Sequence, residues 1–157
     1  MKLKISATRT PKSWLSAFTD VSNQFLEIRA NAFIFLNQTY TPLLRDLAIL
    51  TGSITLQKTS NESLDLIYAA LEITQQLRVD AHGFIIALDE LLGTMQHPPF
   101  NLARTRDRKH YDAIVEFRDT FTGLHTICGN TMDTLASLKS MYERKLDSST
   151  ATPPDID

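Results

Sequence analysis

The side chains best suited to catalysis or metal binding in this sequence are its histidines and its one cysteine. The histidines are His82, His97, His110 and His125. A di-iron site in a helical bundle needs Glu-x-x-His on two helices, but neither this spacing nor His-x-x-x-His occurs. The nearest match is Asp107-x-x-His110, which we interpret as two surface residues near a turn. The sequence therefore predicts no bound metal and no cofactor.

Cys128 lies three residues after His125, so both side chains fall on one face of a helix. A Cys–His pair can activate a thiolate for nucleophilic attack. However, Cys128 also continues an apolar stripe, and free cysteine is among the most buried residue types, so we predict a structural role for it. The sequence contains neither a Gly-x-Ser-x-Gly elbow nor a glycine-rich phosphate loop. We expect a protein that is not an enzyme.

Two clusters of basic residues are the candidate binding sites. The first consists of Arg104, Arg106, Arg108 and Lys109, and the second of Lys2, Lys4, Arg9 and Lys12. The first cluster begins a predicted helix, where the helix dipole disfavours each cation by about 0.3–1 kcal/mol. Folding therefore does not require these charges there, and they suit contact with a phosphate, a lipid headgroup or an acidic partner. The alternative is a turn that the charges keep solvated.

Apolar residues recur every three or four positions along four segments, which predicts four helices. We place these helices at about residues 11–37, 42–56, 62–95 and 105–147, with Thr10 and Ser60 as expected N-caps. Phe33, Ile34 and Leu36 make the first helix apolar on most sides, so we expect several neighbours to bury them. The remaining core residues should include Phe25, Ile28, Leu71, Ile85, Leu88, Phe121 and Leu135.

Two helix boundaries stay open in the sequence. Pro42 is unfavourable inside a helix, so we favour a new helix that starts at Pro42 with Thr41 as its N-cap. A single kinked helix is the alternative. Gly129 and Asn130 could also break the last helix. If the first two helices form one rod, an antiparallel arrangement brings both basic clusters to the same end of the molecule.

These elements predict an all-α fold, an elongated antiparallel helical bundle of three to four long helices packed like a coiled coil. Residues 1–10 would form a basic N-terminal arm, residues 11–147 the bundle, and residues 148–157 a disordered tail. The helix at 62–95 carries six acidic residues against one arginine, Arg78. We interpret this excess of acids as the solvated outer face of the helix.

Composition narrows the class of function. The 157 residues have a net charge of −2, which argues against a dedicated nucleic-acid binder. The first residues lack the apolar stretch of a secretory signal, although a basic, acid-poor start also occurs in transit peptides. The most apolar run, residues 32–36, is far shorter than the roughly 20 residues needed to span a bilayer. A single cysteine fits a reducing compartment, and we expect a cytoplasmic protein.

The expectation that follows is a non-enzymatic interaction module, an adaptor or assembly subunit that binds a protein partner or forms a homo-oligomer. An alternative is a protein that lies on an anionic membrane surface, because the basic arm precedes Trp14, Leu15 and Phe18. A third possibility is a bundle that binds a small ligand between its helices. That function needs an inward-facing polar cluster, which the sequence does not reveal.

Overall fold

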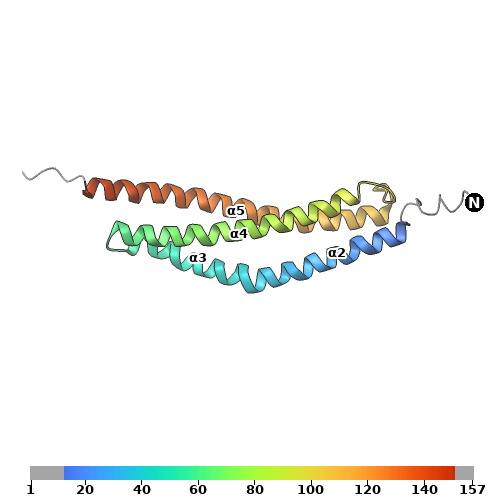
Figure 1. Cartoon of the computed structure of the whole chain (residues 1–157), viewed down its shortest axis with the longest axis horizontal. Helices are drawn as coiled ribbons and strands as arrows, with labels where there is room; N and C mark the ends of the chain where they lie inside the picture. Colours follow the sequence, from blue (N-terminus) through green and yellow to red (C-terminus); the bar gives the residue numbers. More distant parts are fainter. Residues whose placement is uncertain (1–12, 151–157) are drawn as a thin grey trace, which may run out of the picture. The chain divides into compact units, whose positions relative to one another are not determined.

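The fold is all-α, as the apolar periodicity predicts. The computed structural model describes residues 13–150, of which 90% are helical and none lies in a strand (Figure 1). In chain order the elements are α2 (Trp14–Ile34), the π-helix η1 (Phe35–Tyr40), α3 (Thr41–Ser53), the 3₁₀ turn η2 (Ile54–Leu56), α4 (Ser60–Thr94) and α5 (Thr105–Thr150). α2, η1 and α3 follow one another without a break and form one continuous helical segment. With α4 and α5, the described residues therefore contain three such segments, the lower end of the predicted three to four.

The chain divides into two compact units. Unit 1 comprises Met1–Phe33 and Gly83–Phe121, and unit 2 comprises Ile34–His82 and Thr122–Asp157. The division falls inside α4 and inside α5, so each unit takes one segment from each of the three helical stretches. Within the described residues, each unit is therefore a three-helix bundle with its own core.

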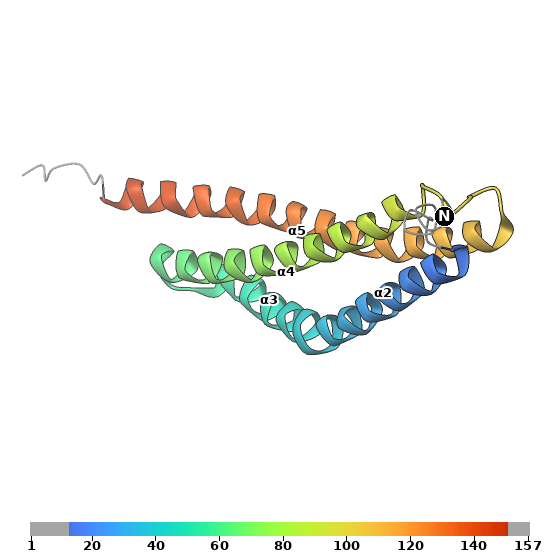
Figure 2. The ribbon, with the colours of Figure 1, turned by 45° about the vertical axis from the view of Figure 1, so that its right-hand side comes forward.

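The core of unit 1 forms where α2 packs against the second part of α4 and the first part of α5. Phe121 is fully buried, stacks on Phe84 with ring centroids 4.8 Å apart, and meets Phe117 edge-on at 5.4 Å. Phe25 also meets Phe117 edge-on, with ring centroids 5.8 Å apart. Residues 95–104 form the turn that connects α4 to α5, and the two helices run antiparallel (Figure 2). Phe100 in this turn is buried.

Unit 2 is held by an apolar cluster to which α3, α4 and α5 all contribute. Its buried members are Leu47, Ile54, Leu64, Ile67, Ala70, Leu135 and Tyr142. Ser63 is buried beside this cluster, and its hydroxyl donates to the carbonyl of Ile54 at 2.7 Å. This hydrogen bond satisfies two polar groups that would otherwise be costly to bury, and it connects the end of α3 to the first turn of α4.

The predicted helix start at Pro42 is wrong, and the continuous alternative is correct. Tyr40 and Thr41 both have right-handed helical backbone angles, and the Thr41 N–H donates to the carbonyl of Leu36, five residues earlier. The Thr41 hydroxyl donates to the same carbonyl at 2.8 Å instead of capping a new helix. A π-turn admits one residue more than an α-turn, which lets the chain pass Pro42 without ending the helix.

The predicted N-cap of the helix after residue 57 also differs from the structure. Ser13 precedes the first residue of α2, and its Oγ accepts from the Ser16 N–H at 3.2 Å. Thr59 caps α4, because its Oγ1 accepts from the Glu62 N–H at 3.1 Å, so Ser60 is already helical. Thr10, the other predicted cap, lies outside the described residues.

The last helix is longer and more regular than the sequence suggests. α5 runs through Gly129 without a break, which excludes the possible stop at that position. It ends at Thr150, so residues 148–150 belong to the helix and only 151–157 of the predicted tail lie outside the described residues. An α-helix tolerates an internal glycine at a cost of about 1 kcal/mol, which the packing of α5 offsets.

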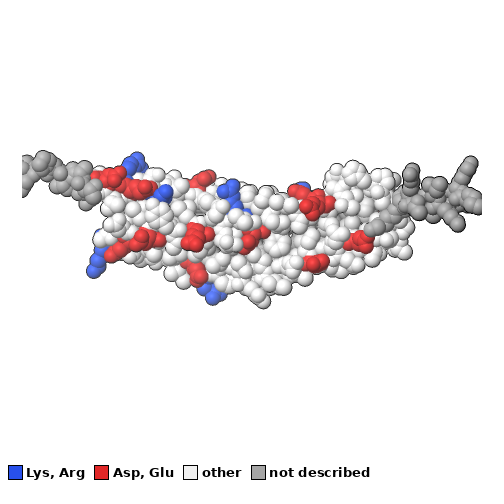
Figure 3. All heavy atoms as spheres, in the orientation of Figure 1, with Lys and Arg blue, Asp and Glu red and all other residues white. Residues whose placement is uncertain are grey.

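The predicted core is mostly confirmed. Phe25, Leu88, Phe121 and Leu135 are buried, whereas Ile28, Leu71 and Ile85 are half-buried. Phe33 and Ile34 are more than half exposed, so the prediction that several neighbours bury them is wrong. Acidic side chains lie on the outside of α4, as Figure 3 shows, in agreement with a solvated face. No helix among the described residues is long and apolar enough to span a membrane.

Candidate functional site

Asp107 anchors the start of α5 to the start of α2 in unit 1. Its carboxylate is fully buried, with Oδ1 accepting from the Trp14 indole N–H at 2.7 Å and Oδ2 accepting from the Asn101 backbone N–H at 2.9 Å. A carboxylate in the first helical turn is also favoured by the helix dipole. Asp107 is therefore a structural residue, and the interpretation of Asp107 as a surface residue near a turn is wrong.

The predicted basic cluster surrounds this buried carboxylate. Arg104, Arg106, Trp14 and Asp107 line a hollow of about 250 Å³, and the Arg106 guanidinium lies 5.5 Å from the centre of the Trp14 ring. Arg108 instead pairs with Asp112 at 3.2 Å on the exposed surface of α5. Arg104, Arg106, Arg108 and Lys109 are all exposed, so the structure keeps all four available to a partner.

The second basic cluster, Lys2, Lys4, Arg9 and Lys12, lies outside the described residues. The contact between Trp14 and Asp107 does place the first described residues of α2 beside the start of α5. This is the proximity expected when the first two helices form one continuous stretch. Whether the two clusters combine into one basic surface stays a prediction.

His110 packs into the same part of unit 1, one helical turn after Asp107. Its ring lies 4.9 Å from that of Phe18 and 5.9 Å from that of Phe25. Burial lowers the pKa of His110, and the nearby Asp107 carboxylate partly opposes this effect. A histidine held among phenylalanines stays neutral at physiological pH, so His110 supports packing and adds no charge to the basic cluster.

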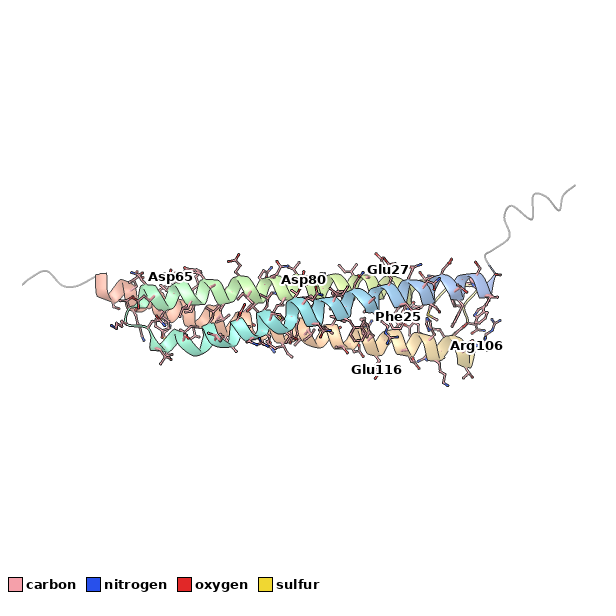
Figure 4. All side chains as sticks on the ribbon, turned by 90° about the horizontal axis from the view of Figure 1, so that it is seen from below. Phe25, Glu27, Asp65, Asp80, Arg106 and Glu116 are labelled. Atoms are coloured by element: carbon pink, nitrogen blue, oxygen red, sulfur yellow. The ribbon has the colours of Figure 1, made fainter. Side chains whose placement is uncertain are left out.

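A groove lies between α2 and α5 in unit 1. It has a volume of about 340 Å³, its floor contains Phe25 and Phe117, and its rims carry Arg29 from α2 and Glu116 from α5. Figure 4 shows Phe25 lying between the two helices while Glu116 points outward from α5. An apolar floor between charged rims is typical of grooves that accept an amphipathic helix.

A row of exposed apolar residues runs along α2, the helix that carries Arg29 of the groove rim. Leu15, Leu26 and Phe33 are 67%, 58% and 52% exposed. Their spacings of eleven and seven residues put them on one face of the helix, and Arg29 of the groove rim lies between Leu26 and Phe33 on that face. Sequence reasoning missed this row because the apolar pattern predicts Phe33 in the core.

Cys128 and His125 lie on the same side of α5 in unit 2 but do not form a nucleophile–base pair. Cys128 is buried, and burial raises the pKa of its thiol, which the nearby Arg78 partly opposes. The Nε2 atom of His125 accepts from the Arg78 guanidinium instead. The predicted structural role of Cys128 agrees with this geometry, since a raised thiol pKa leaves little thiolate to react.

The remaining polar groups of the described chain do not converge on a metal site, because no three His, Cys, Asp or Glu side chains among residues 13–150 lie close enough to share an ion. Arg29, Glu116, Phe117 and the Leu15–Leu26–Phe33 row form the candidate site, and Arg104 and Arg106 lie in the same unit. No family model, curated protein or solved structure matches this chain.

Proposed function

We propose that this protein is a non-enzymatic interaction module that binds an amphipathic helix of a protein partner along the groove between α2 and α5 of unit 1. The observation that supports this proposal is the row of exposed Leu15, Leu26 and Phe33 beside a groove with an aromatic floor. When a partner covers exposed leucine and phenylalanine side chains, the complex is stabilised by roughly 25 cal/mol for each Å² of apolar surface removed from water. A helix with apolar residues at positions i, i+4, i+7 and i+11 matches such a row.

The charges around the groove suggest the polar face of that partner. Ala113, Glu116 and Thr120 line the groove from α5, and Lys109 extends their row by one turn towards the N-terminus of the helix. Arg104 and Arg106 lie at the same end of α5. Acidic residues at one end of the partner helix would therefore pair with Lys109, Arg104 and Arg106. This pairing favours one binding orientation and faster association at low salt.

The alternative of a membrane-surface protein has less support. An interfacial helix needs its large apolar side chains free to enter the lipid. Trp14 and Phe18 are instead half-buried, stack on each other with centroids 4.9 Å apart, and contact Asp107 and His110 within unit 1. Of the three residues that suggested this alternative, only Leu15 stays exposed.

The proposal is tested by affinity purification with the full-length chain as bait, compared with two charge variants. Leu26→Glu places a carboxylate in the exposed row, and Leu56→Glu places one on an even more exposed leucine of unit 2, outside the groove. A specific partner should be retained by Leu56→Glu and lost, at least about tenfold, from Leu26→Glu. Circular dichroism confirms that both variants fold.

Sedimentation velocity then decides whether the partner is a second copy. A concentration-dependent dimer that Leu26→Glu abolishes and Leu56→Glu preserves would identify self-association as the function of the groove. The proposal fails if every captured protein binds both variants equally and the chain stays monomeric. Retention of one partner whose binding instead depends on Arg104 and Arg106 alone would move the site to the hollow beside Trp14.

A further inference from the structure

Arg78 occupies an unusual position for an arginine in unit 2. It is half-buried in α4, directly after the buried Leu77. Its Nε donates to His125 Nε2 over a long distance of 3.4 Å, and its Nη1 lies 3.9 Å from the sulfur of Met132. No carboxylate of the described chain lies within ion-pair distance of Arg78. A half-buried guanidinium normally has a counter-charge, because removing it from water is costly.

The groups around Arg78 do not supply that counter-charge. Burial raises the pKa of the Cys128 thiol, and the positive charge of Arg78 opposes this only in part. The thiol therefore stays neutral near pH 7. Burial also raises the pKa of Tyr40, and Cys128 adds to this effect. Asp80, on the same helix, accepts two hydrogen bonds from Gln76 at 3.0 and 3.1 Å. None of these groups forms an ion pair with Arg78.

Two histidines complete a set of hydrogen-bond donors at this point. The Arg78 Nε–H donates to His125 Nε2, so in the neutral ring the hydrogen is on Nδ1, which becomes a donor. The His82 ring lies with its centroid 5.5 Å from that of His125 and is exposed to solvent. Arg78, His82, His125, Gln75 and Val79 line a pocket of about 180 Å³. No carboxylate lines it, and its volume is several times the roughly 30 Å³ of a water molecule.

We propose that this pocket of unit 2 binds a small tetrahedral oxyanion, either free or as the phosphate group of a larger molecule, with Arg78, His82 and His125 as its ligands. The anion would supply the missing counter-charge and accept from the guanidinium and both imidazoles, which are charge-assisted contacts when the donors are protonated. The pocket and the groove of the proposed function belong to different units, so neither inference depends on the other.

The proposal implies that a bound anion contacts all three side chains. Arg78 supplies the positive charge, and the His125 Nδ1–H and the His82 ring supply further donors. Sulfate is the best probe because it is a dianion throughout the neutral pH range, so its charge stays constant during the titration.

The test is a sulfate titration followed by NMR of the histidine Cε1–H groups at pH 7, with ionic strength held constant by sodium chloride. The resonances of His82 and His125 should shift and saturate, while exposed His97 serves as the internal control. Arg78→Gln should weaken binding by about tenfold.

Arg144→Gln is the matched control, because it removes one exposed cation from the same unit without touching the pocket. If Arg78→Gln fails to fold by circular dichroism, His82→Gln replaces it, since His82 is exposed and not needed for packing. Competition by soluble glycerol phosphate would indicate a free phosphate ester, and competition only by phosphatidic-acid vesicles would indicate a lipid headgroup. Equal responses of all the histidines, or equal weakening in Arg144→Gln, would overturn the proposal.

Discussion

Trp14 and Asp107 are 93 positions apart in the sequence, yet the indole N–H of Trp14 donates to Asp107 Oδ1 over 2.7 Å. The other carboxylate oxygen accepts from the backbone of Asn101, so one buried side chain connects α2, the preceding turn and α5 within unit 1. Both oxygens are satisfied by donors that water cannot easily replace. A buried acceptor that loses one of these donors becomes costly, which makes the contact directly testable.

The first prediction is that Trp14→Phe destabilises the protein by about 1–3 kcal/mol, because it leaves Asp107 Oδ1 buried without a donor. Phenylalanine keeps an aromatic ring against Phe18 and therefore isolates the hydrogen bond from the packing. Urea unfolding followed by circular dichroism measures the change. Phe18→Leu, a change in the same cluster that leaves the hydrogen bond intact, is the control, and an equal loss in both variants would show that packing alone explains the result.

The second prediction concerns the pH dependence that His110 contributes. Burial lowers the pKa of His110 in the folded state below its unfolded value near 6.5. The folded state therefore binds this proton less readily than the unfolded state. The corresponding stability is fully present above about pH 6.5 and is lost as the pH falls through the lowered, folded-state pKa.

Urea unfolding at pH 7 and pH 5 should consequently show a smaller loss of stability on acidification in His110→Asn than in the native chain. His97→Asn is the control, because His97 is exposed. An NMR titration of the His110 ring tests the same point directly, and a midpoint at or above 6.5 would contradict the lowered pKa.

The third prediction separates two possible caps of α4. The Thr59 hydroxyl accepts from the Glu62 N–H, whereas Ser60 is the first helical residue. Thr59→Ala should therefore lower the free energy of unfolding by about 1 kcal/mol. Ser60→Ala should change it by less than about half of that. The reverse order, measured by urea unfolding of the two variants, would restore the cap that the sequence suggested.

Much of this fold could be predicted because the apolar stripes are long and regular. Val21 and Phe25 in α2, Leu88 in α4 and Phe121 in α5 all lie on the expected buried faces. Such stripes fix which side of each helix is covered. They do not fix which neighbour covers the flanks, and for that reason the pattern predicts Phe33 in the core although it is exposed.

The candidate sites could not be predicted, for a different physical reason. Both depend on contacts between residues far apart in the chain, as between Phe25 and Phe117 or between Arg78 and His125. The one local signal was Arg78, the single arginine of a helix whose other charged residues are acidic, and packing alone does not require it. In the same way, Asp107 resembled a solvated turn residue because its partner, Trp14, is distant in sequence.

The fourth prediction tests the core of unit 1. Phe121 is fully buried between Phe84 and Phe117, so Phe121→Ala should destabilise the protein by about 3–5 kcal/mol through lost burial and a residual cavity. Ile127→Ala removes an apolar side chain of the same helix that is 58% exposed. It should cost less than about 0.5 kcal/mol. A loss below about 1 kcal/mol for Phe121→Ala would show that the register of α5 is wrong.

The last prediction concerns the π-helix at Phe35–Tyr40. Phe35 and Leu47 are buried in unit 2, and the apolar positions of α3 begin at Leu43, eight residues after Phe35. Two regular α-turns take about seven residues, so an eighth residue would rotate the stripe off the core. A π-turn absorbs this extra residue and returns Leu43 and Leu47 to the buried side. The spacing in the sequence was therefore an unused signal of the π-helix.

Pro42, which follows this segment, distinguishes a continuous helix from two separate ones. If Pro42 started a new helix, its missing N–H would cost nothing, and Pro42→Ala would be neutral or destabilising by up to about 1 kcal/mol, because alanine leaves the unfolded chain more freedom. In a continuous helix, Pro42→Ala restores a donor inside the hydrogen-bond ladder, so it should stabilise the protein by about 1–3 kcal/mol. Pro42 is exposed, so the change does not disturb the core.

Urea unfolding gives the sign of the change in the free energy of unfolding of Pro42→Ala, and hydrogen exchange shows whether the alanine amide introduced at this position is protected. A destabilised variant in which that amide exchanges freely would mean that the helix is interrupted there.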